Sequence, residues 1–170
     1  MISQMPDSKD IVINTGPLLA IIAALGDLSI LNNLYRQVLV PFEVKKELIG
    51  HGSNRFGVAA FKDAHFLHIQ PRSLSIPPIL QNTLDSGEAS VIQLALIKKI
   101  ETVCIDETIG RRVARLYNLN VTGSLGILLK AKVQGYPISI KHSIEQMQSR
   151  EIYLSKSLID FALKYAGEKI

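Results

Sequence analysis

The sequence has no tryptophan, a single cysteine and no apolar run long enough to cross a membrane. A lone Cys104 excludes a disulfide within one chain and argues against a thiolate metal site. The longest apolar segment, residues 17–25, ends at Gly26, far short of the roughly 20 residues that a transmembrane helix needs. The beginning of the chain carries Asp7 and Asp10 and lacks the basic-then-apolar pattern of a signal peptide. We therefore expect a cytoplasmic protein that does not enter a membrane.

The sequence also lacks internal repeats, low-complexity tracts and the glycine motifs that bind nucleotide phosphates. None of its four histidines has the spacing of metal ligands. An enzyme built around a nucleotide cofactor is therefore disfavoured.

The composition is that of a globular domain, with 170 residues of which 47% are apolar and 20% charged. The net charge of +4 is unevenly placed, because residues 108–150 hold seven basic residues against one acid, Glu145. This segment is either a solvated helix surface or a footprint for the phosphate backbone of a nucleic acid.

Short apolar segments alternate with helical ones along most of the chain, which predicts a parallel sheet wrapped by helices. The expected strands are residues 11–13, 38–40, 67–69, 103–105 and 120–121. The expected helices include residues 42–49, 57–64, 88–99, 107–117 and 124–134. A helical tail follows residue 137, and its last helix carries an apolar stripe that needs a surface to cover it: Leu158, Ile159, Ala162, Leu163 and Ala166.

Four polar residues stand at the ends of expected strands or helices: Asn14, Glu47, Glu88 and Asp106. Each also has a structural explanation. Asn14 and Asp106 could cap the helices that follow them, Glu88 has the spacing of a capping box with Asp85, and Glu47 could be an exposed helical acid. In an open α/β sheet, however, ligands bind at the carboxyl ends of the strands.

The helical phase of Glu88 favours a functional site. At about 100° per residue, Glu88 shares a stripe with Ile92 and Ala95 and is expected to point inward. The opposite side, which we expect to face solvent, carries Ser86, Ser90 and Gln93. A buried carboxylate is costly without a cation or N–H groups beside it. Three carboxylates and one amide would be a hard-oxygen set suited to Mg²⁺ or Mn²⁺, which can assist phosphodiester hydrolysis.

Five short motifs in order resemble the PIN-domain superfamily, and more narrowly a prokaryotic PIN-like subfamily often considered toxin-like nucleases. They are Asn14-Thr15-Gly16-Pro17-Leu18; Val40-Pro41 with Val44 and Glu47-Leu48; Asp85-Ser86-Gly87-Glu88-Ala89; Ile105-Asp106-Glu107 with Gly110-Arg111-Arg112-Val113-Ala114; and Val121-Thr122-Gly123-Ser124-Leu125-Gly126. The similarity covers about residues 11–135.

The resemblance implies a three-layer α/β/α fold with a short central parallel sheet and a helical C-terminal tail. We expect one PIN-like domain over residues 1–170, with a core at about 11–135 and the tail at about 138–170. The resemblance also implies a ribonuclease that depends on Mg²⁺ or Mn²⁺. Such proteins can be toxins that a small antitoxin protein silences, and many form homodimers.

Carried over by position, the catalytic residues would be Asn14, Glu47, Glu88 and Asp106, and the three acids among them would bind the metal. Thr122 or Ser124 would be a polar helper. Two positions depart from the family pattern, since Asn14 replaces the first aspartate and Thr108 stands where a further acid is usual. An asparagine offers a metal an oxygen without charge, so the alternative is a catalytically weakened RNA-binding or protein-interaction module.

Three arginines complete the prediction. Arg111, Arg112 and Arg115 are placed opposite a stripe of Ile109, Val113 and Leu116, so we expect them to face outward. On the implied fold they lie near the acidic site, where they could bind RNA phosphates.

Overall fold

The computed structural model describes residues 8–50, 52 and 54–169. Within these residues five parallel strands form one sheet in the order β3-β2-β1-β4-β5. The strands are β1 (Ile11–Ile13), β2 (Val38–Val40), β3 (His68–Ile69), β4 (Thr102–Cys104) and β5 (Asn120–Thr122). All residues of β1 and β2 are buried, as expected for strands that are covered on both faces.

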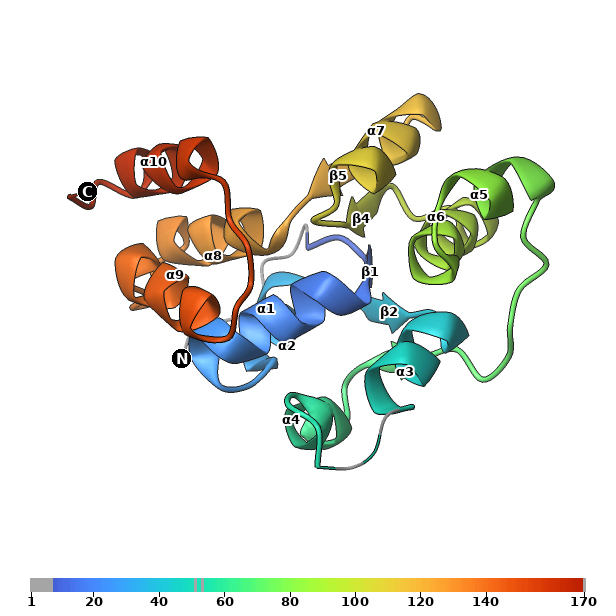
Figure 1. Cartoon of the computed structure of the whole chain (residues 1–170), viewed down its shortest axis with the longest axis horizontal. Helices are drawn as coiled ribbons and strands as arrows, with labels where there is room; N and C mark the ends of the chain where they lie inside the picture. Colours follow the sequence, from blue (N-terminus) through green and yellow to red (C-terminus); the bar gives the residue numbers. More distant parts are fainter. Residues whose placement is uncertain (1–7, 51, 53, 170) are drawn as a thin grey trace.

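Ten helices surround this sheet in the described part of the chain, and Figure 1 shows their arrangement. Their bounds are α1 (Thr15–Leu25), α2 (Ser29–Leu34), α3 (Phe42–Ile49), α4 (Val58–Asp63), α5 (Pro78–Thr83), α6 (Ser86–Lys98), α7 (Thr108–Leu116), α8 (Ser124–Val133), α9 (Ile140–Ser149) and α10 (Lys156–Tyr165). The predicted three-layer α/β/α fold with a parallel sheet is confirmed.

Helix α1 explains why residues 17–25 are apolar on every side. One side of α1 packs in the main core with the strands through residues such as Leu18 and Ile21. Its other side carries Ala20 and Ala24, which pack against α8, α9 and α10 in a second apolar cluster. In Figure 1 α8 and α9 lie next to α1 and α10 lies beyond them, whereas α5, α6 and α7 lie on the other side of the strands.

The predicted stripe of the last helix is covered by the same chain. Ala162 and Leu163 of α10 are buried against α8 and α9, and Ile159 and Ala166 are partly buried there. Leu158 is 42% exposed and lies at the margin of this contact.

The strand order reverses at β1, with β2 and β3 on one side and β4 and β5 on the other. Chain connections that leave β1 and β4 in opposite directions open a crevice at the carboxyl ends of these strands, where α/β proteins bind ligands. Asn14 follows β1, and Asp106 lies two residues beyond β4. The sheet therefore brings these two positions to the same edge.

The predicted orientation of α7 is wrong, and that of α6 is wrong at Ser90, although Glu88 is buried and Ser86 is exposed as expected. Ser90 of α6 is fully buried, because α6 contacts α3 and α7 as well as β1 and β4 and has little solvent side. In α7 the buried residues are Gly110 and Ala114, whereas Ile109 and Leu116 are 60% and 76% exposed. The small residues let α7 approach the sheet closely, so the larger apolar ones lie outside. In the described ranges no helix is long and apolar enough to span a membrane.

Candidate active site at the carboxyl ends of the strands

Asn14 lies between β1 and α1 with its side chain only 7% exposed. Its backbone N–H donates to the carbonyl oxygen of Cys104 at 3.1 Å, which ties it to the adjacent strand. Its side chain does not cap α1, so that structural explanation is wrong. Among the described residues, Asn14 Oδ1 is a buried acceptor without a hydrogen-bond partner. Burying such an oxygen costs about 1–3 kcal/mol, and a bound group that pairs with it would recover this energy.

Glu47, on α3, is held toward α1. The hydroxyl of Thr15, which is buried, donates to Glu47 Oε2 at 3.0 Å. Sequence reasoning missed Thr15, because a threonine at the start of a helix is too ordinary to mark a role. Its only signal was its position directly after Asn14.

The oxygens of Asn14 and Glu47 both lie close to Gly87. A Cβ atom added to Gly87 would lie 3.0 Å from Asn14 Oδ1 and 3.1 Å from Glu47 Oε2. Asp85 Oδ1 would be 3.5 Å from the same point. Three oxygen atoms from α3, α6 and the end of β1 therefore surround a residue without a side chain.

Glu88 is inward, as its helical phase predicted, and is 6% exposed. Its backbone N–H donates to Asp85 Oδ1 at 2.8 Å, so the predicted cap of α6 is also present. The carboxylate lies against α7, since a Cβ atom on Gly110 would be 3.2 Å from Glu88 Oε1. Burial, together with the negative charges of Asp85, Glu107 and Glu47, raises the pKa of Glu88 to about 7.

Asp106 is exposed, and its carboxylate contacts a helix other than α7, the helix that follows it in the chain. Its Oδ1 accepts a hydrogen bond at 2.8 Å from the backbone N–H of Ser124, the first residue of α8. Asp106 therefore caps a neighbouring helix rather than α7, whose N-cap position is Glu107. The two predicted polar helpers, Ser124 and Thr122, differ in their contacts. Ser124 contacts Asp106 through its backbone N–H, and the residue is only 2% exposed. The hydroxyl of Thr122 donates to the carbonyl oxygen of Gly123 at 3.4 Å.

Arg111 differs from the prediction, because its side chain turns toward the site. Its Nη1 donates to the carbonyl oxygen of Ile105 at 2.8 Å. A Cβ atom on Gly123 would lie 2.7 Å from Asp106 Oδ1 and 2.8 Å from Arg111 Nη1. Arg112 and Arg115 are exposed as predicted.

The predicted residues thus share one edge of the sheet but do not form a ready-made metal centre. In the part of the chain that the structure describes, no group of three or more His, Cys, Asp or Glu side chains is arranged to hold a metal ion. The donor chemistry nevertheless fits a hard divalent cation, because every donor is an oxygen. The unpaired Oδ1 of Asn14 beside Glu47 Oε2 gives such an ion a point of attachment.

The profile of the PIN-domain family matches residues 10–168, which is nearly the whole chain. A comparison with curated proteins gave no significant match. PIN domains have a nuclease-type fold, generally depend on divalent metals and are associated with RNA. The sheet order, the oxygen-lined strand ends and the match over residues 10–168 agree: this chain belongs to the PIN-domain family.

Proposed function

We propose that the protein is a ribonuclease that depends on Mg²⁺ or Mn²⁺. The observation that carries the proposal is that Asn14 Oδ1, which has no hydrogen-bond partner among the described residues, and Glu47 Oε2 both lie close to Gly87. A buried amide oxygen without a partner and a carboxylate oxygen, both close to one glycine, form a set that a cation would stabilise. Glu88 follows Gly87 on α6, and Asp106 lies beyond the carboxyl end of β4.

The metal-binding residues in this proposal are Glu47, Glu88 and Asp106, with Asn14 as a neutral oxygen donor. When bound, the ion would activate water and stabilise the charge of the phosphodiester as it is cleaved. Thr15 positions Glu47 through its hydrogen bond at 3.0 Å. The backbone N–H of Ser124 positions Asp106, leaving its second oxygen, Oδ2, for a ligand. Glu88 carries a proton on half of the molecules near pH 7, so a cation competes directly with that proton.

RNA would be held near this edge by cations on α7. Arg112 and Arg115 are exposed and available to phosphates, while Arg111 is directed toward Asp106 and Gly123. Thr122, at the end of β5, is a polar helper in the same region. Contacts of this kind supply affinity without reading sequence.

A nuclease assay tests the proposal. Purified protein with Mn²⁺ or Mg²⁺ should cleave single-stranded RNA, and EDTA should stop the cleavage. Asp106→Ala, prepared in the same way, should lose at least about 100-fold in rate, the scale of removing a group that stabilises transition-state charge. Equal rates for wild type and Asp106→Ala would show that the cleavage comes from a contaminant.

The second candidate is an RNA-binding module whose catalysis is weak. Asn14 favours it, because an amide gives the cation no charge where the family usually has an aspartate. This candidate predicts RNA binding that weakens steeply with salt and no cleavage above the Asp106→Ala background. Undetectable binding at low salt would remove it.

We also propose that the protein acts with a protein partner, either a small antitoxin that silences it or a second copy in a homodimer. Phe161 and Tyr165 on α10 are 59% and 61% exposed, and their rings stack with centroids 5.9 Å apart. Exposed aromatic pairs are typical of interfaces. The mass in solution, compared between wild type and Phe161→Ser, tests the homodimer. A single domain over residues 1–170 and a cytoplasmic location stay predictions from the sequence.

A further inference from the structure

A hollow of about 590 Å³ lies next to the proposed metal site, with which it shares Glu47 and Asp85. It is lined by α3, Ser73 and the start of α6, and its walls include Phe42, Glu43, Glu47 and Ser86. A second hollow of about 320 Å³ shares Glu43, Ser73 and Ser86 with it and adds the apolar side chains of Leu74 and Ile76.

Glu43 stands where the two hollows meet and has an unpaired oxygen. The hydroxyl of Ser73 donates to Glu43 Oε1. Glu43 Oε2 is buried and has no hydrogen-bond partner among the described residues. A carboxylate oxygen accepts hydrogen bonds and gives none, and an unsatisfied buried one is costly. An N–H or O–H donor on a bound group, or a cation, would satisfy this oxygen.

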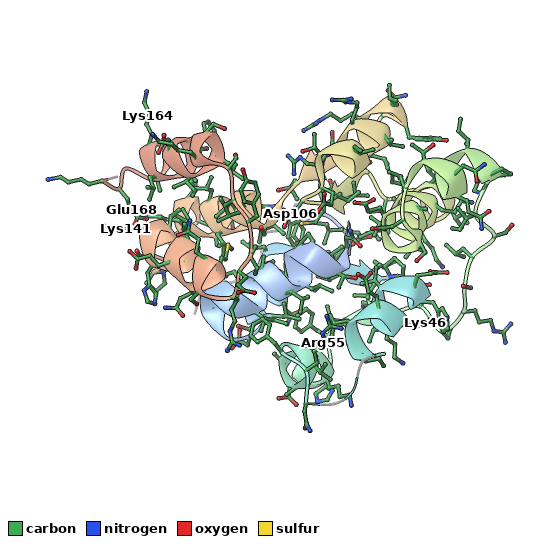
Figure 2. All side chains as sticks on the ribbon, viewed as in Figure 1. Lys46, Arg55, Asp106, Lys141, Lys164 and Glu168 are labelled. Atoms are coloured by element: carbon green, nitrogen blue, oxygen red, sulfur yellow. The ribbon has the colours of Figure 1, made fainter. Side chains whose placement is uncertain are left out.

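The charges of the hollow restrict that group further. Among the described residues, Glu43, Glu47 and Asp85 line the hollow together with one cation, Lys46, so a phosphate would be repelled from its interior. A neutral group with donors on its edge and flat apolar faces fits better. Phe42, Leu74 and Ile76 supply apolar contacts for such faces. Lys46 is exposed on α3, as Figure 2 shows, and can bind a phosphate outside the hollow.

We propose that this hollow is a subsite for one unpaired guanine base of an RNA strand, with Glu43 as the residue that selects it. Proteins read single-stranded RNA by hydrogen bonds to base edges and by contacts with base faces. The 2-amino group of guanine carries two N–H bonds, which match Glu43 Oε2 and the hydroxyl oxygen of Ser73, and the bond to the charged carboxylate is the stronger of the two. Because Glu47 lines the hollow and also belongs to the proposed metal site, the bound base would lie beside the position of cleavage. The inference rests on the proposed function, since it needs RNA as the ligand.

The test measures binding rather than cleavage. Uridine oligonucleotides that carry one central guanosine, inosine or adenosine are titrated with the full chain in EDTA, and binding is followed by fluorescence anisotropy. Wild type should bind the guanosine strand roughly tenfold more tightly than the inosine strand, which lacks only the 2-amino group. Glu43→Gln should remove this preference and leave binding of the inosine strand unchanged within about twofold.

Two further variants keep the result interpretable. Glu101→Gln makes the same change of charge at a side chain that is 74% exposed, at the amino end of β4 and thus at the opposite edge of the sheet, and it should keep the preference. Ser73→Ala leaves Glu43 in place and removes one of the two proposed contacts, so it should weaken the preference in part. If Glu43→Gln does not fold by circular dichroism, Ser73→Ala alone decides the matter.

Several outcomes would overturn the subsite. They are equal binding of the three strands by wild type, a preference that survives in Glu43→Gln or is untouched in Ser73→Ala, and tighter binding of the adenosine strand. Loss of Mn²⁺ binding in Glu43→Gln would also overturn it, because the oxygen would then hold a cation. The proposed nuclease activity can be rejected independently of the subsite. If wild type prefers guanosine through Glu43 but cleaves no RNA in Mn²⁺, the guanine subsite is supported and the nuclease activity is contradicted.

Discussion

Asp106 and Ser124 are joined by a hydrogen bond of 2.8 Å from the backbone N–H at the start of α8 to Asp106 Oδ1. This bond links the end of β4 to the helix that follows β5, so the acid is positioned by an element 18 residues further along the chain. Capping and metal binding are thus compatible for Asp106, because a carboxylate has two oxygens and one cap uses only one of them.

Asn14→Asp should strengthen the proposed metal site. An aspartate there adds a negative charge beside Glu47 at almost unchanged volume, so we expect Mn²⁺ affinity to rise about tenfold and any RNA cleavage to increase. Isothermal titration with Mn²⁺ measures the first effect and the nuclease assay the second. Unchanged affinity would mean that Asn14 does not face the ion.

Glu88 should make the stability of the metal-free protein depend on pH. Its folded-state pKa of about 7 lies above the ordinary value of 4.5, so the folded state favours the protonated carboxyl. The free energy of unfolding is therefore highest, as far as Glu88 is concerned, below pH 4.5. It should fall by about 2–3 kcal/mol as the pH rises through 7 and the buried carboxyl loses its proton. Urea denaturation between pH 5 and pH 8 measures this decrease.

Glu88→Gln should flatten that dependence, because glutamine does not titrate. In wild type, added Mn²⁺ should bind more tightly at pH 8 than at pH 6, since the ion needs the deprotonated carboxylate. A decrease in stability that is equally steep in Glu88→Gln would assign it to another group.

Gly87→Ala should weaken metal binding without unfolding the protein. The added Cβ would lie 3.0 Å from Asn14 Oδ1 and 3.1 Å from Glu47 Oε2, so these oxygens must separate by some tenths of an ångström. We expect Mn²⁺ affinity to fall about tenfold, because metal ligation is sensitive to small displacements. Gly16→Ala is the matched control: Gly16 is also the second residue of its helix, and a Cβ there meets nothing within 4 Å.

Glu168 should stabilise the C-terminal helices. Its carboxylate accepts hydrogen bonds from Lys132 Nζ at 2.6 Å, from the backbone N–H groups of Ile140 and Lys141 at 2.6 and 3.1 Å, and from the Ser139 hydroxyl at 3.1 Å. Figure 2 shows Glu168 beside Lys141 at the start of α9. Glu168→Gln should cost about 1–3 kcal/mol of unfolding free energy, and the exposed Glu145→Gln almost none.

The same carboxylate should lose its effect in acid. Burial alone would raise the pKa of Glu168, but the hydrogen bonds from Lys132, Lys141, Ile140 and Ser139 outweigh it and hold the pKa at about 2. Since this is below the ordinary value of 4.5, the contribution is present above pH 4.5 and declines toward pH 2. The difference in unfolding free energy between wild type and Glu168→Gln should therefore shrink with acidification, as urea denaturation at pH 3 and pH 6 would measure.

Arg111 and Arg112 should behave differently although they are neighbours. Arg112→Met removes an exposed cation and should lower the salt dependence of RNA binding by about one unit of the log–log slope. Arg111→Met breaks the hydrogen bond of 2.8 Å to the Ile105 carbonyl oxygen, so it should also cost about 1–2 kcal/mol of stability. Salt titrations of RNA binding and urea denaturation of both variants measure the two effects, and equal loss of stability would contradict the assigned orientation.

Local patterns predicted most of the fold. The apolar run of 11–13 became β1, and the predicted helix 42–49 has the same bounds as α3. Glu88 was correctly predicted to be inward, because its neighbours at helical spacing are apolar. The phase of α7 was predicted wrongly, since hydrophobicity pointed to Ile109 and Leu116 while close packing selected Gly110 and Ala114. Periodicity cannot show that a neighbouring strand leaves room only for a glycine.

The alternation of strands and helices along the chain, the inward direction of Glu88 and the polar residues that follow the strands are determined by the amino-acid sequence itself, because the spacing of apolar and polar residues is a local property. The order of the strands in the sheet is known only from the tertiary structure. Contacts between distant segments were decided only by the tertiary structure: Thr15 with Glu47, Asp106 with Ser124, and Asn14 Oδ1 with the space at Gly87. Their geometry depends on how closely helices and strands pack, which is set by the whole core rather than by any one segment.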